Sequence, residues 1–592
     1  MEKTYQIYSI NGPVITIKGK TDLSMMEMVF VGKDRLAGEV ILIDNEKTTI
    51  QVYEETAGLS AGEPIYPSGS PLTITLGPGL MSNIFDGIER PLAVIKQQSG
   101  AFIKKGSLIP SLDAQKKWDV TFLVKEGDFL EGGAAYASCP ETSAIKHYCL
   151  LAPNLSGEVV EVKPDGQYTV NETVLKLKDA GGKLHDITLC QKWPIRTPRP
   201  VKERMSSDRP LLTGQRILDT LFPVAKGGAA AIPGGFGTGK TMTQHQLAKW
   251  CDADIIIYVG CGERGNEMTQ VLQEFSELID PKTGKPMTER TILIANTSNM
   301  PVAAREASIY TGVTLAEYYR DMGYHTAMMA DSSSRWAEAL REISGRLEEM
   351  PADEGFPAYL PSRLSEFYER AGYMKTLCDK EGSITLIGAV SPQGGDFSEP
   401  VTQNTKRFTR CFWALDKTLA YARHYPAINW TTSYSEYLNS LAPWYAENLS
   451  PKFMRNREKI ASLLQQEADL MEIVKLIGSD VLPDDQKLII EIARVIRVGF
   501  LQQNAFHEID TYVPLEKQYQ MMRIILYLYK QCSLIVSQQI PISQIKELGL
   551  FDKAIQLKYL IPNDDLSGIE DFKEEIDAAL TKFNIASGGN LA

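Results

Sequence analysis

The stretch Gly234-Gly235-Phe236-Gly237-Thr238-Gly239-Lys240-Thr241 decides the fold of this chain. It satisfies the pattern G-x-x-x-x-G-K-[ST], in which glycines let backbone N–H groups converge on phosphate oxygens. An apolar run at residues 229–232 precedes it, and residues 242–250 can continue as a helix, so the required strand–loop–helix context is present. The alternative is a glycine-rich turn that carries a surface lysine.

Each part of this loop has a chemical role in binding a triphosphate. The N-terminus of the following helix adds positive potential, Lys240 reaches the outer phosphates, and the Thr241 hydroxyl can coordinate Mg²⁺. We therefore expect a nucleoside triphosphate with magnesium to bind here. Contacts with the phosphates are expected from Gly234, Gly235, Phe236, Gly237, Thr238, Gly239, Lys240, Thr241 and Met242.

Outward from the loop, between about residues 211 and 430, apolar strands alternate with helical patterns, which predicts a parallel sheet covered by helices. Ligands of open parallel sheets lie at the carboxyl ends of the strands, so we expect the chemistry at those junctions. The expected strands are residues 229–232, 254–259, 291–295, 326–330 and 383–390.

Acidic residues follow two of these expected strands. Asp331 follows residues 326–330 and could serve the magnesium shell directly or through water; the alternative is a helix-capping Asp. Glu263 and Arg264 follow residues 254–259, and Glu263 could orient an attacking water; the alternative is a surface ion pair between the two. A phosphate loop with both groups would hydrolyse the nucleotide.

The rest of the chain divides around this core. Residues 5–66 contain short β-rich runs, at 14–17 and 49–53, which predict a small antiparallel barrel. The glycine-punctuated segment 111–192 is again strand-rich, and its residues 155–160 and 167–170 are expected as hairpin pieces. After Ser435 the pattern is helical, for example at residues 488–496 and 521–536, and residues 586–590 are expected as a frayed tail.

These observations predict a multi-domain α/β chain, consistent with a length of 592 residues, which fits roughly three or four domains. The expected boundaries are a β-barrel at 1–72, a P-loop nucleotide-binding domain at 73–110 and 193–435, a β-rich insertion at 111–192, and a helical domain at 436–592.

The composition narrows the function classes. A net charge of −12 disfavours a general nucleic-acid binder. We find neither a signal-peptide pattern at the start nor a run of about eighteen apolar residues, so we expect a cytosolic chain that does not span a membrane. The eight cysteines are expected as reduced, mostly buried thiols; Cys139, His147 and Cys149 suggest a metal only weakly, because no second ligand pair with zinc spacing follows.

Taken together, these pieces resemble the catalytic A subunit of the archaeal and vacuolar-type rotary ATPases over nearly the whole chain. Residues 426–435, Pro-Ala-Ile-Asn-Trp-Thr-Thr-Ser-Tyr-Ser, resemble a segment shared by rotary ATPase catalytic and partner subunits, and residues 111–192 lie where the family's catalytic chain carries its insertion. The other segments that carry the resemblance, besides the phosphate loop, are residues 84–88, 214–219, 262–267, 359–364, 394–400 and 500–506.

The resemblance implies an N-terminal β-barrel, an insertion, a RecA-like nucleotide domain and a helical C-terminal domain. It implies three such chains alternating with three B subunits in an A3B3 ring, with central rotor-stalk and peripheral-stalk subunits and, indirectly, a membrane ion-transport sector. The activity would be hydrolysis of ATP with Mg²⁺, or its synthesis from ADP in reverse, coupled to proton or sodium movement, at the cytoplasmic face of a membrane. Nucleic acid is not an expected partner.

The family's residue roles carry over to matching positions. Glu263 would polarise the attacking water, while Lys240, Arg264 and Arg335 would bind or stabilise the γ-phosphate. Thr241 and Asp331 would serve magnesium, the latter through water. The resemblance further places Tyr425 and Phe506 on either side of the adenine, although both rings could equally be core packing.

This chain departs from the family at three places. Gly235 stands where the archaeal and vacuolar loop usually has Pro, which favours a more flexible loop. Thr238 replaces a cysteine that serves redox control in eukaryotic relatives, so such control is not expected. Residues 497–499 lack the acidic pair that is common there.

Rival functions within the same fold are a hexameric RNA translocase of the Rho type and a protein-export ATPase; acidic charge and the long insertion disfavour both. A non-catalytic nucleotide-binding subunit, like the B partner, is disfavoured because Lys240, Thr241, Glu263 and Asp331 are all intact.

Overall fold

The computed structural model describes residues 4–100, 103–107, 109–280, 283–478 and 481–586, and within it the chain forms two compact units. Of the tail expected at residues 586–590, Ala586 ends the last helix and the rest lies outside the described residues. The first unit comprises Met1–Ser206, Lys226–Ala231 and Ala253–Thr409, and the second comprises Ser207–Ala225, Ile232–Asp252 and Arg410–Ala592.

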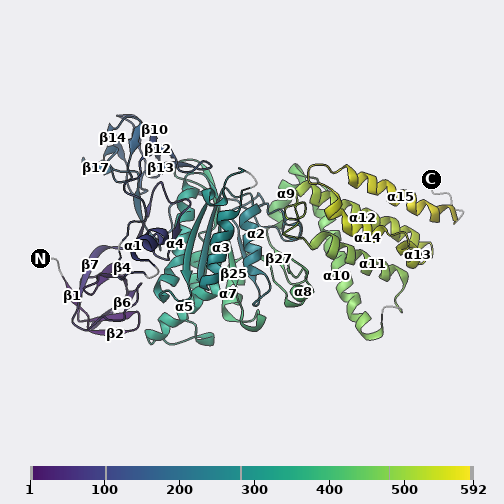
Figure 1. Ribbon diagram of the computed structural model, residues 1–592, viewed down its shortest axis with the longest axis horizontal. Helices are drawn as coiled ribbons and strands as arrows, with labels where there is room; N and C mark the ends of the chain where they lie inside the picture. The colour runs from purple at the N-terminus through teal and green to yellow at the C-terminus, as the bar shows by residue number, and fades with distance from the viewer. Residues whose placement is uncertain (1–3, 101–102, 108, 281–282, 479–480, 587–592) are drawn as a thin grey trace. The chain divides into compact units, whose positions relative to one another are not determined.

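The first unit begins with a seven-stranded antiparallel sheet in the order β1-β7-β4-β5-β6-β3-β2, drawn in purple in Figure 1. Alternating apolar residues such as Ile15, Val29 and Ile50 point inward from neighbouring strands and are fully buried, which gives this sheet its own core. The strands are β1 (Tyr5–Gln6), β2 (Ser9–Asn11), β3 (Val14–Lys18), β4 (Glu27–Val31), β5 (Leu36–Ile43), β6 (Lys47–Val52) and β7 (Pro64–Pro71).

The β-rich segment that follows forms two four-stranded sheets, in the orders β13-β12-β10-β15 and β11-β14-β16-β17. The two expected hairpin pieces are strands β14 and β15, but they do not pair with each other: β14 pairs with β11 and β16, and β15 pairs with β10. The strands are β10 (Trp118–Phe122), β11 (Phe129–Leu130), β12 (Ala135–Pro140), β13 (Lys146–Leu150), β14 (Gly157–Val162), β15 (Gly166–Tyr168), β16 (Leu175–Lys178) and β17 (Leu184–Ile187).

The expected parallel sheet is confirmed in the first unit, with the order β20-β25-β23-β21-β22-β9. The pairs from β25 to β9 are all parallel, and β24 adds an antiparallel strand beside β25. The strands of this region are β8 (Thr73–Leu76), β9 (Ile84–Phe85), β18 (Gln191–Pro194), β19 (Glu203–Met205), β20 (Ala229–Pro233), β21 (Ile255–Glu263), β22 (Thr291–Thr297), β23 (His325–Asp331), β24 (Gly372–Lys375) and β25 (Glu381–Val390).

Helices cover this sheet, and α4 (Val302–Asp321) is buried over almost its whole length because it packs against β21, β22, β23 and β25. The other helices of this unit are α1 (Leu92–Ser99), α3 (Gly265–Glu277), η2 (Met287–Arg290), α5 (Ser333–Arg346), η3 (Asp353–Gly355), α6 (Leu360–Tyr368), η4 (Gln393–Gly395) and α7 (Pro400–Phe408).

Buried ion pairs join the N-terminal sheet to α4. The Arg196 guanidinium lies 3.0 Å from a carboxylate oxygen of Glu39 on β5 and 2.7 Å from one of Glu306 on α4. A buried charge that loses its partner is strongly destabilising, so this bridge fixes how the N-terminal sheet is attached to the covered face of the parallel sheet.

The second unit contains the phosphate loop, the antiparallel pair β26 (Cys411–Phe412) and β27 (Tyr434–Ser435), and the expected helical C-terminal region. Stacked rings of Tyr445 and Phe453, with centroids 4.2 Å apart, lie in the core of the helices. The helices are η1 (Ile217–Leu221), α2 (Lys240–Trp250), α8 (Lys417–Tyr421), α9 (Leu438–Asn448), α10 (Phe453–Ile477), α11 (Asp484–Arg494), η5 (Val495–Leu501), α12 (Leu515–Ser537), α13 (Ile542–Lys546), α14 (Leu550–Leu560) and α15 (Ser567–Ala586).

Within the described part of the chain, no helix is both long enough and apolar enough to cross a bilayer.

Glu89, a buried carboxyl just after β9, gives a test of the first unit's core. Its Oε2 accepts a hydrogen bond from the Thr75 backbone at 2.7 Å, and burial raises its pKa to about 8. In the unfolded chain a glutamate titrates near pH 4.3. The folded state therefore retains a proton that the unfolded state loses, so stability falls as the pH rises from about 4.3 to about 8.

We expect Glu89→Gln, which cannot ionise, to raise the midpoint of thermal unfolding by several degrees at pH 8 and to leave it unchanged near pH 4.5. Scanning fluorimetry across this range measures the effect, with the exposed Glu126→Gln as the control. If Glu89→Gln shifts the midpoint of thermal unfolding by the same amount at pH 8 and at pH 4.5, the raised pKa of Glu89 is not the cause.

Candidate active site

The phosphate loop joins β20 to α2. Gly237 and Gly239 have φ angles of 77° and 92°, a region that favours glycine, and these turns bring the backbone round before Lys240 begins α2. The Lys240 ammonium donates to the carbonyls of Gly234 and Gly235 at 2.8 and 3.1 Å, and the Thr238 hydroxyl donates to Gly235 at 2.8 Å. The cation is therefore held over the concave side of the loop.

The N-terminus of α2 is suited to an anion. Its N-cap residue is Gly239, which has no side chain to accept a hydrogen bond from the first-turn N–H groups, and the first turn carries no acidic residue. The eleven residues of α2 are long enough for the aligned peptide dipoles to give partial positive charge at this end. Thr241 follows Lys240 in the first turn of this helix.

Gly235 lies close to the side chain of Lys417. A Cβ at this position would lie 2.4 Å from Cε of Lys417, the first residue of α8. The Lys417 methylenes thus occupy space that a larger residue would need. Because this is the far end of a flexible side chain, it could move aside, and the contact does not by itself require glycine; the expected flexibility of the loop stays a prediction.

Glu263 and Asp331 lie at the carboxyl ends of adjacent parallel strands of the first unit. The strand β21 extends four residues beyond the expected end at Val259 and finishes on Glu263, while β23 finishes on Asp331. Gly260 of β21 stands in register with Asp331. The structure therefore places both carboxylates at one edge of the sheet.

Asp331 is buried, and its Oδ2 accepts a hydrogen bond from the Tyr258 hydroxyl at 3.1 Å. The alternative of a capping Asp is wrong, because Ser332 is the N-cap residue of α5. A buried carboxylate at a strand end is a single oxygen donor of the kind that Mg²⁺ prefers, and among the described residues it belongs to no group of three or more His, Cys, Asp or Glu side chains arranged for a metal.

Glu263 has a strongly shifted pKa. Burial is the largest cause, the negative charges of Asp331 and Glu267 add to it, and together they raise the pKa to about 8 against an opposing effect of Arg335. The carboxylates repel one another at this edge. A cation bound among them would relieve that repulsion, and Glu263 is a stronger base than an exposed glutamate.

The two arginines expected at the γ-phosphate flank this edge. Arg335 lies on α5, half exposed, with its guanidinium 2.8 Å from Glu338. It approaches β21 closely, since a Cβ at Gly262 would lie 2.7 Å from the Cβ of Arg335. Arg264 follows Glu263 and is the N-cap residue of α3.

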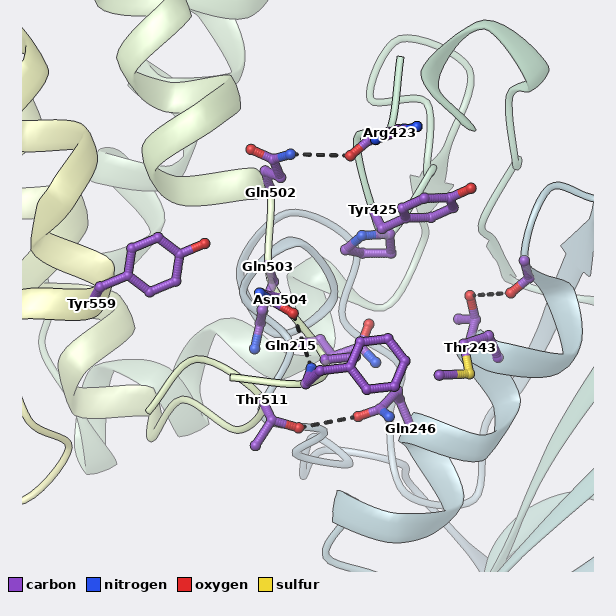
Figure 2. A pocket seen from close by; sticks show the side chains of 15 residues that line it. Gln215, Thr243, Gln246, Arg423, Tyr425, Gln502, Gln503, Asn504, Thr511 and Tyr559 are labelled. Carbon is purple, nitrogen blue, oxygen red and sulfur yellow. Dashed lines mark hydrogen bonds between the residues drawn. The ribbon is translucent and has the colours of Figure 1, made fainter. Parts of the chain in front are cut away.

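A cavity of about 500 Å³ lies within the second unit, beside the start of α2 (Figure 2). Tyr425 and Phe506 both line it, with 43% and 86% of their surface exposed, so neither ring is core packing. The lining is mainly apolar with a few amide and hydroxyl groups, a composition suited to a planar heterocycle. The residues that line it are Gln215, Gly239, Met242, Thr243, Gln246, Arg423, Tyr425, Pro426, Gln502, Gln503, Asn504, Ala505, Phe506, Thr511 and Tyr559.

Sequence reasoning missed part of this lining. Gln246 comes from the face of α2 and accepts a hydrogen bond from the Thr511 hydroxyl at 3.4 Å, as Figure 2 shows. Tyr559 comes from α14, more than fifty residues after Phe506. The helical spacing of Gln246 from Met242 could have indicated its position, but no local pattern marks Tyr559.

The phosphate loop, Tyr425 and Phe506 thus belong to the second unit, and Glu263, Arg264, Asp331 and Arg335 belong to the first. The weak cysteine and histidine metal suggestion is not supported. Among the described residues no cluster of His, Cys, Asp and Glu has the arrangement of a metal site, and His147 instead contacts Glu141 and Tyr318 at 2.7 and 3.0 Å. Six of the eight cysteines are buried, and Cys190 and Cys378 are partly exposed.

Comparison with known families identifies each region of the chain. Residues 7–69 match the ATP synthase alpha/beta family beta-barrel domain, and residues 109–196 match the ATPsynthase alpha/beta subunit barrel-sandwich domain. Residues 214–435 match the ATP synthase alpha/beta family nucleotide-binding domain, and residues 442–546 match the C-terminal domain of V and A type ATP synthase. The expected fold class is confirmed.

Curated relatives match almost end to end. The V-type ATP synthase alpha chain of Halothermothrix orenii is 60% identical over 578 residues, covering 98% of both chains. The V-type ATP synthase alpha chain 2 of Clostridium tetani is 60% identical over 572 residues, covering 97% of this chain and 96% of that one. The corresponding A-type ATP synthase chain of Methanopyrus kandleri is 54% identical over 575 residues, covering 97% of both.

Among solved structures, the assembled ATPase EscN of the enteropathogenic E. coli type III secretion system aligns with a TM-score of 0.62 at 21% identity. The alignment covers 88% of this chain and 99% of that one. At this identity the likeness concerns the fold alone.

Proposed function

Since the chain belongs to the family of V-type ATP synthase alpha chains and their A-type counterparts, we propose that its phosphate loop, Glu263 and Asp331 act on one Mg–ATP. The family makes this chain the catalytic subunit of a rotary ATPase, an enzyme that hydrolyses or synthesises ATP. The observation that carries the residue assignment is the pair of carboxylates at the ends of adjacent strands β21 and β23.

Each side chain has a defined part in this proposal. Lys240, Arg264 and Arg335 bind the γ-phosphate and stabilise the charge that develops on it. The Thr241 hydroxyl and the Asp331 carboxylate, the latter through water, hold the magnesium ion, which supplies charge compensation for the phosphate oxygens. Glu263 accepts a hydrogen bond from the attacking water and polarises it.

The base of the nucleotide occupies the cavity beside α2. An adenine ring between Tyr425 and Phe506 gains stacking on flat apolar faces, and the amide groups of the lining provide donors and acceptors at its edge. The large exposure of Phe506 supports this assignment, because an aromatic ring left open at the mouth of a cavity is available to a ligand.

The assembly belongs to the same proposal. Three copies of this chain alternate with three B subunits in an A3B3 ring, and an arginine of each neighbouring B subunit completes the site. Rotor-stalk and peripheral-stalk subunits connect the ring to a membrane sector that moves protons or sodium ions, so the chain lies at the cytoplasmic face without entering the bilayer.

The base cavity provides a direct test. We expect Phe506→Ala to raise the Kd for ATP roughly 5- to 150-fold, since stacking of a base on an aromatic ring contributes about 1–3 kcal/mol. Inorganic tripolyphosphate, which has no base, should bind unchanged. Isothermal titration calorimetry measures both ligands.

Tyr421→Ala is the matched control, because Tyr421 is similarly exposed, at 84%, but does not line the cavity. Equal losses of ATP and tripolyphosphate binding in Phe506→Ala, or no loss of either, would place the base elsewhere.

A further inference from the structure

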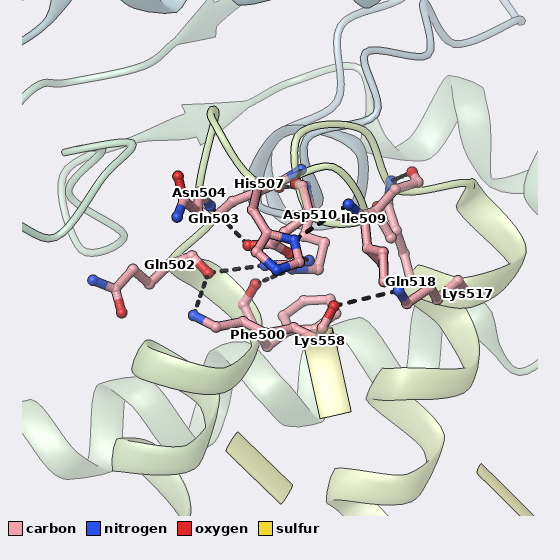
Figure 3. Close-up of polar contacts among 12 residues, drawn as sticks. Phe500, Gln502, Gln503, Asn504, His507, Ile509, Asp510, Lys517, Gln518 and Lys558 are labelled. Atoms are coloured by element: carbon pink, nitrogen blue, oxygen red, sulfur yellow. Dashed lines mark hydrogen bonds and ion pairs between the residues drawn. The ribbon is translucent and has the colours of Figure 1, made fainter. Parts of the chain in front are cut away.

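The wall of the base cavity formed by residues 502–506 follows directly on the π-helix η5. Carbonyl groups at the C-terminal end of a helix have no partners inside the helix and need donors from elsewhere. Two of those donors are buried basic side chains from distant parts of the second unit, Arg216 and Lys558. Figure 3 shows Lys558 beside Phe500 and Gln502.

Arg216 reaches the wall from the start of the unit. Its Nε donates to the carbonyl of Phe500 and its Nη2 to that of Gln502, at 2.5 and 2.8 Å. Its Nη1 lies 2.5 Å from Oδ1 of Asp510, and both of these charged side chains are fully buried. The other oxygen of Asp510 accepts a hydrogen bond from the backbone N–H of Asn504 at 2.7 Å. Arg216 therefore binds carbonyl groups of residues 500 and 502, and its partner Asp510 binds the N–H group of residue 504.

Lys558 comes from α14 and makes equivalent bonds. Its ammonium donates to the carbonyls of Val498 and Gln502 at 2.7 and 3.1 Å, and only 2% of the residue is exposed. Tyr559, the next residue of α14, lines the cavity itself. The Gln502 carbonyl therefore receives donors from both Arg216 and Lys558.

Removal of the Lys558 ammonium would leave the Val498 carbonyl without this donor and would remove one of the two from Gln502. Val498 and Gln502 are half-buried, and carbonyls with little access to water cost free energy when they lose a partner, which the chain can lower by shifting residues 502–506 toward water. Such a shift would move Phe506 and the cavity edge without touching the phosphate loop.

We propose that Lys558 is a positioning residue for nucleobase recognition: by holding the end of η5 it fixes residues 502–506 at the distance from Tyr425 that a purine requires. This inference rests on the proposed assignment of the cavity to the base. It makes affinity for the base depend on a helix of the C-terminal region whose lysine does not touch the nucleotide.

The test compares Lys558→Met with Lys558→Arg in the full chain, and uses Lys553→Met as the matched control. Lys553 lies on the same helix, pairs with Glu575 and is far more exposed.

Calorimetry with ATP and with inorganic tripolyphosphate separates binding of the base from binding of the phosphates. The expected result for Lys558→Met is a Kd for ATP raised about tenfold and a Kd for tripolyphosphate changed less than twofold. We expect Lys558→Arg to recover most of the ATP affinity.

Two results would overturn the proposal: unchanged ATP affinity in Lys558→Met, or parallel losses of ATP and tripolyphosphate. If Lys558→Met does not fold, Lys558→Gln replaces it: its amide is uncharged and one bond shorter than the lysine side chain, so a shift in the ratio of the two Kd values in the same direction is required of it. Phe506→Ala shows which of the two proposals fails. If Phe506→Ala changes the ratio of the Kd for ATP to the Kd for tripolyphosphate and the Lys558 variants do not, only the positioning role of Lys558 is wrong. If Phe506→Ala does not change this ratio, the assignment of the cavity to the base is wrong.

Discussion

Glu263→Gln is expected to lower the turnover number by about 10²–10⁴-fold while leaving the Kd for Mg–ATP within a few fold of the unsubstituted chain. Positioning and polarising water matter in the transition state more than in the bound ground state, so the loss falls on turnover. The glutamine keeps the size and hydrogen-bonding shape of the side chain but removes its basicity. The repulsion with Asp331 also disappears, which favours binding of the nucleotide.

Assay of the assembled complex, together with calorimetry on the chain, measures both quantities. Glu277→Gln, at the exposed far end of α3, is the control that changes the same charge away from the strand ends. Loss of nucleotide binding with a normal single-turnover rate would contradict the role and favour the interpretation of Glu263 as an ion-pair partner of Arg264.

The second large effect concerns the neighbouring B subunits. The chain alone should bind Mg–ATP but turn over about 10³–10⁵-fold more slowly than the chain assembled with them, the range supplied by an arginine in trans. This corresponds to a barrier difference of about 4–7 kcal/mol. Arg335, which lies on the chain's own α5, is paired with Glu338 in this structure.

Native mass spectrometry and ATPase assays, with and without B subunits, test this result together with ring assembly. Nucleotide binding by the separate chain, measured under the same conditions, is the control for its folding. Steady turnover by the monomer at the rate of the complex would show that the chain needs no group in trans.

Local patterns were sufficient to predict the parallel sheet and the elements that carry the phosphate loop. They were less accurate at strand ends: the expected strand stopped at Val259, before Gly260 and Gly262, which have weak strand propensity, yet pairing with β22 extends β21 to Glu263. Here tertiary hydrogen bonding overrides propensity, and it places the proposed catalytic glutamate on the sheet rather than on a loop.

Pairing between distant segments was beyond sequence reasoning. Strands β14 and β15 are neighbours along the chain but pair with other strands, because register depends on which apolar faces can be buried together. Tyr559 reaches the cavity beside α2, and Lys558 reaches the end of η5, only through the packing of α14 against η5, and a buried lysine has no periodic signal in sequence.

The hydrogen bonds from Lys558 to the end of η5 have a reciprocal meaning. If the packing of α14 strengthens binding of the base by a given free energy, then a bound base stabilises the packing of α14 by the same amount. Under the proposed role of Lys558, nucleotide occupancy and the order of the C-terminal helices would be thermodynamically linked within a single chain. Any force that displaces α14 would weaken the hold on the base, and a bound base would resist that displacement.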